Sequence, residues 1–376
     1  MKIALIGNGI SSGGLVSMLS EFLRCHPGGD TEVTLFCSKD FLSHYTNINS
    51  SIKIETTDTL SESKWTSFFC NRYQREFVKL IEGYNPDSVF FITGTCKKGL
   101  EKYNSYIVLN NQLYTNYKRL FKQRSLKIAL TTSIFALKFR RNLKFISHVF
   151  FSSEYSKKES MGVLHVKDCI VDPFACNSNF YLPEERVNYE INKGVKLLNI
   201  GSIIPYKNQL VVIEALKLLR DNGYDFQMTF VGKPLSNGYN NTCRRKIAEY
   251  GLTNNIKFIE WLNQAQIIEA IDNCDIFINS SETDTCATAV EEGMARCKPV
   301  IASDTLFNKE MVCDGGLYFS LDDPQSLCKS IIDYIENEGL RREKAQRGYA
   351  LSKNWTLQDT ARGYYEKILS DNKALI

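Results

Sequence analysis

The feature that most constrains the fold is a regular alternation of short apolar runs with longer amphipathic runs. The apolar runs of the first half, read as buried strands, are KIALIG (2–7), EVTLFCS (32–38), SVFFITG (88–94), SYIVLN (105–110) and HVFFSS (148–153). The pattern then starts again, with VKLLNIG (195–201), FQMTFVG (226–232), NIKFIEW (255–261), DIFINSS (275–281) and PVIAS (299–303). Strands alternating with helices predict parallel sheets covered by helices on both faces. We therefore expect an α/β protein with two Rossmann-like, doubly wound halves.

The two halves are separated by a polar stretch. PEERVNYEINKG, residues 183–194, has no periodic apolar pattern and is interpreted as a linker. A chain of 376 residues is long enough for two such domains. The expected boundaries are a first domain over 1–188, a second over 189–355, and a final amphipathic helix over 356–376.

Composition excludes several other classes of protein. The twelve cysteines are scattered without a C-x-x-C pair and the four histidines lie far apart, which argues against zinc sites and a disulfide scaffold. The net charge of +4 is too small to indicate a nucleic-acid partner. No apolar run reaches the length of a membrane span or a secretory signal. These observations predict a cytoplasmic protein with no bound metal.

An acidic segment follows the fourth predicted strand of the second half. The stretch SSETDTCATAVEEGMARCKPVIAS (280–303) has Asp284 just before a predicted helix and Glu292 inside it. The helix is expected to start near Thr285–Ala287, where unpaired N–H groups and the helix dipole favour a phosphate. A ligand with phosphates at this helix start and hydroxyl groups beyond them could reach both carboxylates. Acidic caps on a solvated helix are the alternative interpretation.

The same segment resembles a motif of the family-4 glycosyltransferases, in which an acidic residue and a Glu are separated by seven residues. Met294-Ala295 and Pro299-Val300 set the register of the match. The resemblance implies that Asp284 contacts the sugar of a nucleotide-sugar donor and that Glu292 binds the ribose. In place of the family's Glu and its Gly-Phe-Gly, this chain has the shorter Asp284 and Thr285-Cys286-Ala287.

A second resemblance to that family covers NIGSIIPYKNQLVVIEALKLL (199–219). It implies that Lys207 places a cation over the donor diphosphate, while Ser202 stands where the family usually has Arg. A preorganised cation stabilises the negative charge that a departing diphosphate gains. The donor-binding residues implied by these and weaker matches are Gly13, Gly14, Gly201, Ser202, Lys207, Gly232, Lys233, Glu260, Trp261, Asp284, Thr285, Cys286, Ala287, Thr288 and Glu292. The catalytic residues implied are Lys207, Asp284 and Glu292.

The first half contributes less specific signals. GNGISSGG (7–14) departs from a dinucleotide-binding pattern at two places. Ser12 stands at the third position of the pattern, and the second strand ends in Cys37-Ser38 where an acidic residue is expected. The glycosyltransferase resemblance instead implies that Gly13 and Gly14 face the donor diphosphate. Asn110 and Asn111 stand where the family often has a His, and they are expected to hydrogen-bond the acceptor. His148 is interpreted as structural.

The resemblance implies the GT-B fold, in which two Rossmann-like domains face each other across a cleft and the C-terminal helix crosses back to the first domain. The family retains anomeric configuration and needs no cofactor or metal, and D-x-D is absent from the sequence. We expect a UDP- or GDP-sugar donor, and a glycan or lipid-linked acceptor in surface polysaccharide or lipopolysaccharide synthesis. The alternatives are a weakened binding or scaffold protein, and a sugar-nucleotide epimerase or phosphorylase of the same fold.

One stretch of the first half is strongly basic. Residues 103–153 contain nine Lys or Arg and no Asp or Glu, with aromatic residues between them. A solvated helical face is one interpretation. The other is that the basic region 118–144 docks on an anionic membrane surface, which would place the protein peripherally at the inner membrane face.

Overall fold

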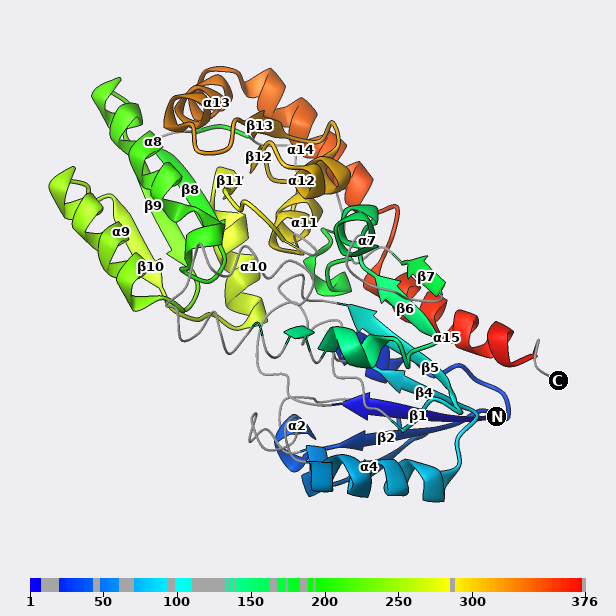
Figure 1. Cartoon of the computed structure of the whole chain (residues 1–376). Helices are drawn as coiled ribbons and strands as arrows, with labels where there is room; N and C mark the ends of the chain where they lie inside the picture. The colour runs from blue at the N-terminus through cyan, green and yellow to red at the C-terminus, as the bar shows by residue number, and fades with distance from the viewer. Residues whose placement is uncertain are drawn as a thin grey trace. The chain divides into compact units, whose positions relative to one another are not determined.

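The computed structural model of the chain (Figure 1) describes residues 1–7, 20–42, 48–60, 71–92, 99–109, 133, 136–137, 139–161, 168–172, 175–182, 189–191, 194–284 and 288–373. These residues divide into two compact units. The first unit is Met1–Asn177 together with Trp355–Ile376, and the second unit is Ser178–Asn354. Each unit is built on its own parallel sheet, so the predicted α/β class with two doubly wound domains is confirmed.

The described residues of the first unit form a seven-stranded sheet in the order β3-β2-β1-β4-β5-β6-β7. Its strands are β1 (Lys2–Gly7), β2 (Glu32–Cys37), β3 (Ile52–Thr56), β4 (Ser88–Phe91), β5 (Asn104–Leu109), β6 (His148–Phe151) and β7 (Asp168–Val171). Its helices are α2 (Lys39–Leu42), α4 (Asn71–Tyr84), α7 (Glu154–Met161) and α15 (Leu357–Lys373), with a 3₁₀ turn at Asp58–Leu60.

The described residues of the second unit form a six-stranded sheet in the order β10-β9-β8-β11-β12-β13. Its strands are β8 (Val195–Ile200), β9 (Phe226–Val231), β10 (Ile256–Ile259), β11 (Ile276–Asn279), β12 (Val300–Ser303) and β13 (Leu317–Phe319). Its helices are α8 (Gln209–Asp221), α9 (Asn237–Glu249), α10 (Gln264–Asn273), α11 (Thr288–Ala295), α12 (Leu306–Val312), α13 (Pro324–Glu336) and α14 (Glu338–Ser352). Short 3₁₀ turns lie at Ser178–Phe180 and Pro205–Lys207.

The strands that the sequence analysis did not predict are β3, β7 and β13, and all of them lie at an edge of their sheet. An edge strand is covered less completely, so fewer of its residues need to be apolar. In β3 only Ile52 is buried, and every residue of β7 is half-buried. The continuous apolar run that marks a central strand is therefore missing from β3 and β7, and β13 is only three residues long.

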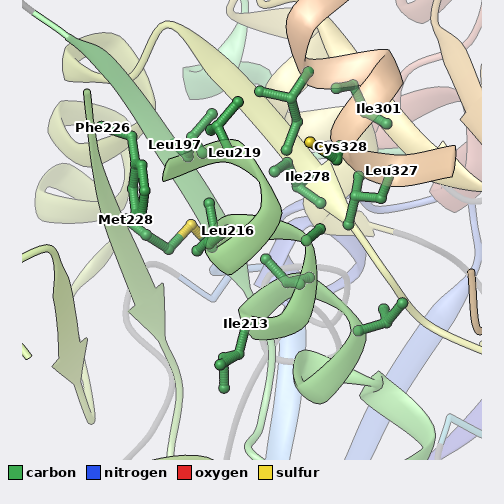
Figure 2. Close-up of a cluster of buried hydrophobic side chains, with 14 of the residues drawn as sticks. Leu197, Ile213, Leu216, Leu219, Phe226, Met228, Ile278, Ile301, Leu327 and Cys328 are labelled. Atoms are coloured by element: carbon green, nitrogen blue, oxygen red, sulfur yellow. The ribbon is translucent and has the colours of Figure 1, made fainter. Parts of the chain in front are cut away.

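The core of the second unit explains why α8 forms where it does. The sequence of α8 places Val212, Leu216 and Leu219 on one buried face, at the spacing of an amphipathic helix. Figure 2 shows Leu216 and Leu219 packed beside Met228 and Leu197 of the sheet. Burial of such side chains stabilises the fold by roughly 1.5–3 kcal/mol each.

The C-terminal helix α15 belongs to the first unit, as the fold class predicted. The Tyr365 ring stacks on Phe22 with their centroids 4.5 Å apart. The neighbouring Tyr364 ring lies 4.4 Å from Phe150 and 5.7 Å from Phe90, measured between ring centroids. A reciprocal cap, in which Thr356 N–H donates to Asp359 and Asp359 N–H donates to Thr356 Oγ1, fixes where the helix begins. Aromatic packing therefore anchors the helix on the unit that contains the N-terminus, while the cap is local to the first turn.

The far end of α15 is held by a polar cluster at the amino ends of the strands. His148 Nδ1 lies 2.9 Å from Asp168 Oδ2, and its Nε2 lies 3.0 Å from Asn104 Oδ1. Tyr106 Oη donates to Asp371 Oδ2 of α15 at 2.9 Å. The hydrogen bond from His148 holds the pKa of Asp168 below its usual value. His148 thus lies in a hydrogen-bonded structural cluster, as the sequence suggested.

A glycine inside α15 is required by close packing. Gly363 lies against Asp172, and a Cβ at position 363 would come 2.7 Å from Asp172 Oδ2. Asp172 itself is only 6% exposed, so its carboxylate has little room to move. This contact offsets the usual cost of glycine in a helix interior.

We therefore expect Gly363→Ala to lower the free energy of unfolding by about 1–3 kcal/mol, because the added methyl group overpacks this contact. The matched control is Gly238→Ala in α9, where nothing lies within 4 Å of the added Cβ. That control is expected to be neutral or to stabilise by up to about 1 kcal/mol through helix propensity. Urea denaturation followed by circular dichroism measures both, and equal stabilisation by the two changes would contradict the packing argument.

Candidate functional site

The candidate site lies in the second unit, where the order of its strands reverses. β8 and β11 are neighbours in the sheet, although β9 and β10 come between them in the chain. In such sheets, ligands bind beyond the carboxyl ends of the strands at this reversal point. The loop 201–207 follows β8 and the segment 280–284 follows β11. Both carry residues that the sequence analysis selected.

Two glycines bring the loops after β8 and β9 into direct contact. A Cβ at Gly232, whose φ is +152°, would lie 2.2 Å from the carbonyl oxygen of Gly201. The backbone N–H of Gly201 donates to Val231 O at 2.8 Å, and that of Ile203 donates to Lys233 O at 2.9 Å. Only glycine fits at 232 because any side chain would strike backbone atoms. The Lys233 side chain is exposed beside this junction.

Lys207 and Asp284 meet across the reversal point. Lys207 Nζ lies 2.5 Å from Asp284 Oδ2, and the two side chains are 19% and 22% exposed. The methylenes of Lys207 pass Gly201 closely, since a Cβ there would lie 3.5 Å from Lys207 Cδ. The structure therefore brings together Gly201, Lys207 and Asp284, as the predicted donor site requires.

The backbones beneath this pair are also tied together. Ser280 Oγ donates to Lys207 O at 2.7 Å, and the N–H of Glu282 donates to Tyr206 O at 2.8 Å. Gln209 Nε2 donates to the carbonyl oxygen of Ser202 at 3.0 Å, which fixes the start of the same loop. These hydrogen bonds, all accepted by carbonyl oxygens of the loop 201–207, tie that loop to its own helix and to the acidic segment.

A buried polar network that the sequence analysis missed supports the acidic segment. Asn279 Oδ1 accepts from Ser281 N–H at 3.0 Å, and Asn279 Nδ2 donates to Asn308 Oδ1 at 3.2 Å. Ser303 Oγ donates to Ser281 O at 2.6 Å and accepts from Asn308 Nδ2 at 2.9 Å. All four residues are buried, so these hydrogen bonds, in which Ser281 takes part through its main chain, make the burial of Asn279, Ser303 and Asn308 tolerable. A polar Asn-Ser-Ser directly after an apolar strand was the available signal.

Glu292 projects from the fifth position of α11, which begins at Thr288. The residue is 9% exposed, and its burial raises the pKa of the carboxyl group to about 8. Near neutral pH the group is therefore mostly protonated, and it can both donate to and accept from a ligand hydroxyl. Glu291 beside it is buried as well.

The remaining predicted residues are placed less centrally or lie outside the described residues. Glu260 and Trp261 follow β10 at the edge of the same sheet, and Trp261 is 64% exposed. The predicted residues outside the described part of the chain are Gly13, Gly14, Asn110, Asn111, Thr285, Cys286 and Ala287. Their assignments stay predictions.

In the described ranges, no group of three or more His, Cys, Asp or Glu residues is arranged to hold a metal ion. The helices of those ranges include none that is long and apolar enough to span a membrane.

Comparison with known proteins relates part of the chain to a known family. Residues 183–351 match the model of the family described as glycosyl transferases group 1. An uncharacterized glycosyltransferase of Methanocaldococcus jannaschii is 28% identical over 171 residues, which cover 44% of this chain and 45% of that protein. Protein CapJ of Staphylococcus aureus is 25% identical over 231 residues, 57% and 58% of the two chains. The chain thus spans about half the length of the curated relatives it matches.

Solved structures with the same fold cover nearly the whole chain. HepE from Anabaena, solved with UDP and glucose, has a TM-score of 0.73 at 18% identity and covers 99% of this chain and 100% of its own. WaaG, described as a glycosyltransferase involved in lipopolysaccharide biosynthesis, has a TM-score of 0.72 at 13% identity, with coverage of 97% and 99%. The chain therefore has the GT-B fold. Residues 183–351 match the model of the group 1 glycosyltransferases, so the resemblance seen in the sequence is confirmed at this level.

The buried carboxyl group of Glu292 makes a pH-dependent contribution to stability. Between pH 4.5 and 8 the unfolded chain has lost this proton while the folded chain keeps it, so stability falls as pH rises through this window. Glu292→Gln, which does not titrate, should be more stable than the native protein by about 2–4 kcal/mol at pH 9 and similar to it at pH 4. Denaturant titrations at both pH values test this. Parallel stability–pH curves for the two proteins would contradict the assigned pKa.

Proposed function

We propose that the protein is a retaining, family 4-like glycosyltransferase that uses a UDP- or GDP-sugar donor. The observation that carries the proposal is the meeting of Lys207 and Asp284 at the strand-reversal point of a group 1 glycosyltransferase domain. The described complex of HepE with UDP and glucose supports a nucleotide sugar as donor. The description of WaaG supports a role in lipopolysaccharide or surface polysaccharide synthesis, with a glycan or lipid-linked acceptor.

In this proposal each site residue has a distinct task. Lys207 neutralises the diphosphate, together with backbone N–H groups at the start of α11 near Thr288. Asp284 accepts hydrogen bonds from hydroxyl groups of the sugar, and Glu292 binds the ribose. Because the leaving diphosphate carries more charge in the transition state than in the donor, a fixed cation lowers the barrier.

The reaction we propose is a front-face substitution. The bond between C1 of the sugar and the phosphate oxygen breaks, and a bond from C1 to the acceptor oxygen forms on the same face. The acceptor hydroxyl gives its proton to the departing phosphate oxygen, so the products are the glycoside and the nucleoside diphosphate. No enzyme nucleophile or metal is needed in this scheme, because Lys207 and the helix N–H groups supply the positive charge.

The test begins with a thermal-shift screen of nucleotide sugars, followed by a nucleotide-release assay. Glu292→Ala is expected to weaken binding of the selected donor by about tenfold or more, because the ribose loses a buried partner. Lys207→Ala is expected to lower kcat by about a hundredfold, as for loss of one transition-state contact. Calorimetry and steady-state kinetics measure these effects. Unchanged donor binding and turnover in both variants would refute the assignment of the site.

A binding or scaffold role is the second candidate, because Ser202 occupies the place of the family's arginine and its carbonyl is engaged by Gln209. In that case calorimetry would detect the donor while no sugar is transferred. An epimerase or phosphorylase of the same fold would also differ in its products. Release of nucleoside diphosphate only when an acceptor is present favours the transferase over both alternatives.

We also propose that the basic region 118–144 docks a cytoplasmic protein on an anionic membrane surface. The support is the run of nine cations without an acid over 103–153. Most of region 118–144 lies outside the described residues. The protein is expected to pellet with vesicles containing phosphatidylglycerol and to stay in solution with phosphatidylcholine vesicles at low salt. Equal pelleting with both would exclude the proposal.

A further inference from the structure

We propose that Asp284 helps to release the nucleoside diphosphate after transfer, by pairing again with Lys207 once the sugar has left. This inference rests on the proposed function and adds a step to it. Its basis is that Lys207 Nζ, the cation assigned to the diphosphate, lies 2.5 Å from the carboxylate of Asp284, which is assigned to the sugar.

The contacts around Lys207 and Asp284 allow this ion pair to form again without a change in the backbone. Ser280 and Glu282 tie the backbone of the acidic segment to that of Lys207 and Tyr206. The buried network around Asn308 holds the same segment from below. Since both backbones are braced, the pair opens and closes by side-chain rotation, and no loop has to refold.

Competition for Lys207 follows from the charges. A diphosphate bound at Lys207 stands beside the Asp284 carboxylate, and like charges at this distance repel in a partly buried site. With an intact donor, hydroxyl groups of the sugar donate hydrogen bonds to Asp284, and these offset the repulsion and the lost ion pair. After transfer the sugar stays on the acceptor, so this compensation is gone while the diphosphate remains. Asp284 then competes for the ammonium group and weakens product binding.

The site would therefore discriminate between substrate and product through a single carboxylate. A residue that only held the sugar would leave binding of the sugar-free nucleotide unaffected. A residue that acts as proposed lowers the affinity for the sugar-free nucleotide, and its neutral counterpart raises that affinity. Asp284→Asn keeps the size of the side chain and removes its charge, so it separates the two roles.

The experiment is calorimetry of the native protein with UDP, GDP and ADP and with UDP-glucose, GDP-mannose and ADP-glucose. The nucleoside diphosphate and the matching nucleotide sugar that bind are then measured with the variants. Asp284→Asn is expected to bind the nucleoside diphosphate about three- to tenfold more tightly than the native protein, in the range of a partly exposed ion pair. The affinity for the nucleotide sugar should rise less or fall. The dissociation constant of the nucleoside diphosphate, divided by that of the nucleotide sugar, therefore decreases. Inhibition of turnover by added nucleoside diphosphate should become stronger in the variant.

Two controls isolate the cause. Asp221→Asn removes the acid of another Lys–Asp pair, Lys217–Asp221, which also has a separation of 2.5 Å, and it should leave both dissociation constants unchanged. In a Lys207→Gln background, Asp284→Asn should increase the affinity for the nucleoside diphosphate much less, because the ammonium group with which Asp284 pairs is absent. An equal gain in that background would mean simple repulsion and would overturn the proposed re-pairing.

The possible failures can be told apart. If the native protein binds none of the six nucleotides, the proposed function fails and this inference falls with it. If the native protein binds them and Asp284→Asn weakens only the nucleotide sugar, leaving the nucleoside diphosphate unchanged, Asp284 is only a sugar ligand. In that case the release role is wrong while the proposed function stands.

Discussion

The pairing of β8 with β11 is the interaction on which the candidate site depends. The two strands run parallel, with Leu197 opposite Ile276 and Leu198 opposite Phe277. Asn199 adds a side-chain hydrogen bond to Ile278 O at 2.8 Å. Parallel strands end at the same edge of a sheet, so this pairing places Lys207 next to Asp284 although 77 residues separate them. Every role proposed for this site assumes that juxtaposition.

The second unit contains two kinds of buried polar group, one satisfied by hydrogen bonds and one with a raised pKa. The group formed by Asn279, Ser281, Ser303 and Asn308 satisfies its hydrogen bonds internally, which gives the acidic segment one fixed conformation. Glu292 is instead buried at the cost of a raised pKa. The polar group beneath the acidic segment thus avoids the cost of desolvation, while the carboxyl group of Glu292 bears it.

The sequence predicted the central elements of both sheets well, because buried strands need continuous apolar runs. It did not predict β3, β7 and β13, whose edge positions relax that need. It located Lys207, Asp284 and Glu292 through local motifs at strand ends and helix starts. It gave no account of Asn308, a residue of the short helix α12 whose importance depends on partners from β11 and β12.

By itself the sequence determined the α/β class, the repeat of the doubly wound pattern and the types of residue at the carboxyl ends of the strands. Those properties follow from local periodicity and from short motifs, which neighbouring residues encode. Only the tertiary structure decided that Lys207 and Asp284 form an ion pair and that Asp172 leaves no room for a side chain at position 363. It also decided that Glu292 is buried enough to stay protonated near neutral pH. These properties depend on distances between segments far apart in the chain, and distance and burial arise only when the sheet and its helices assemble.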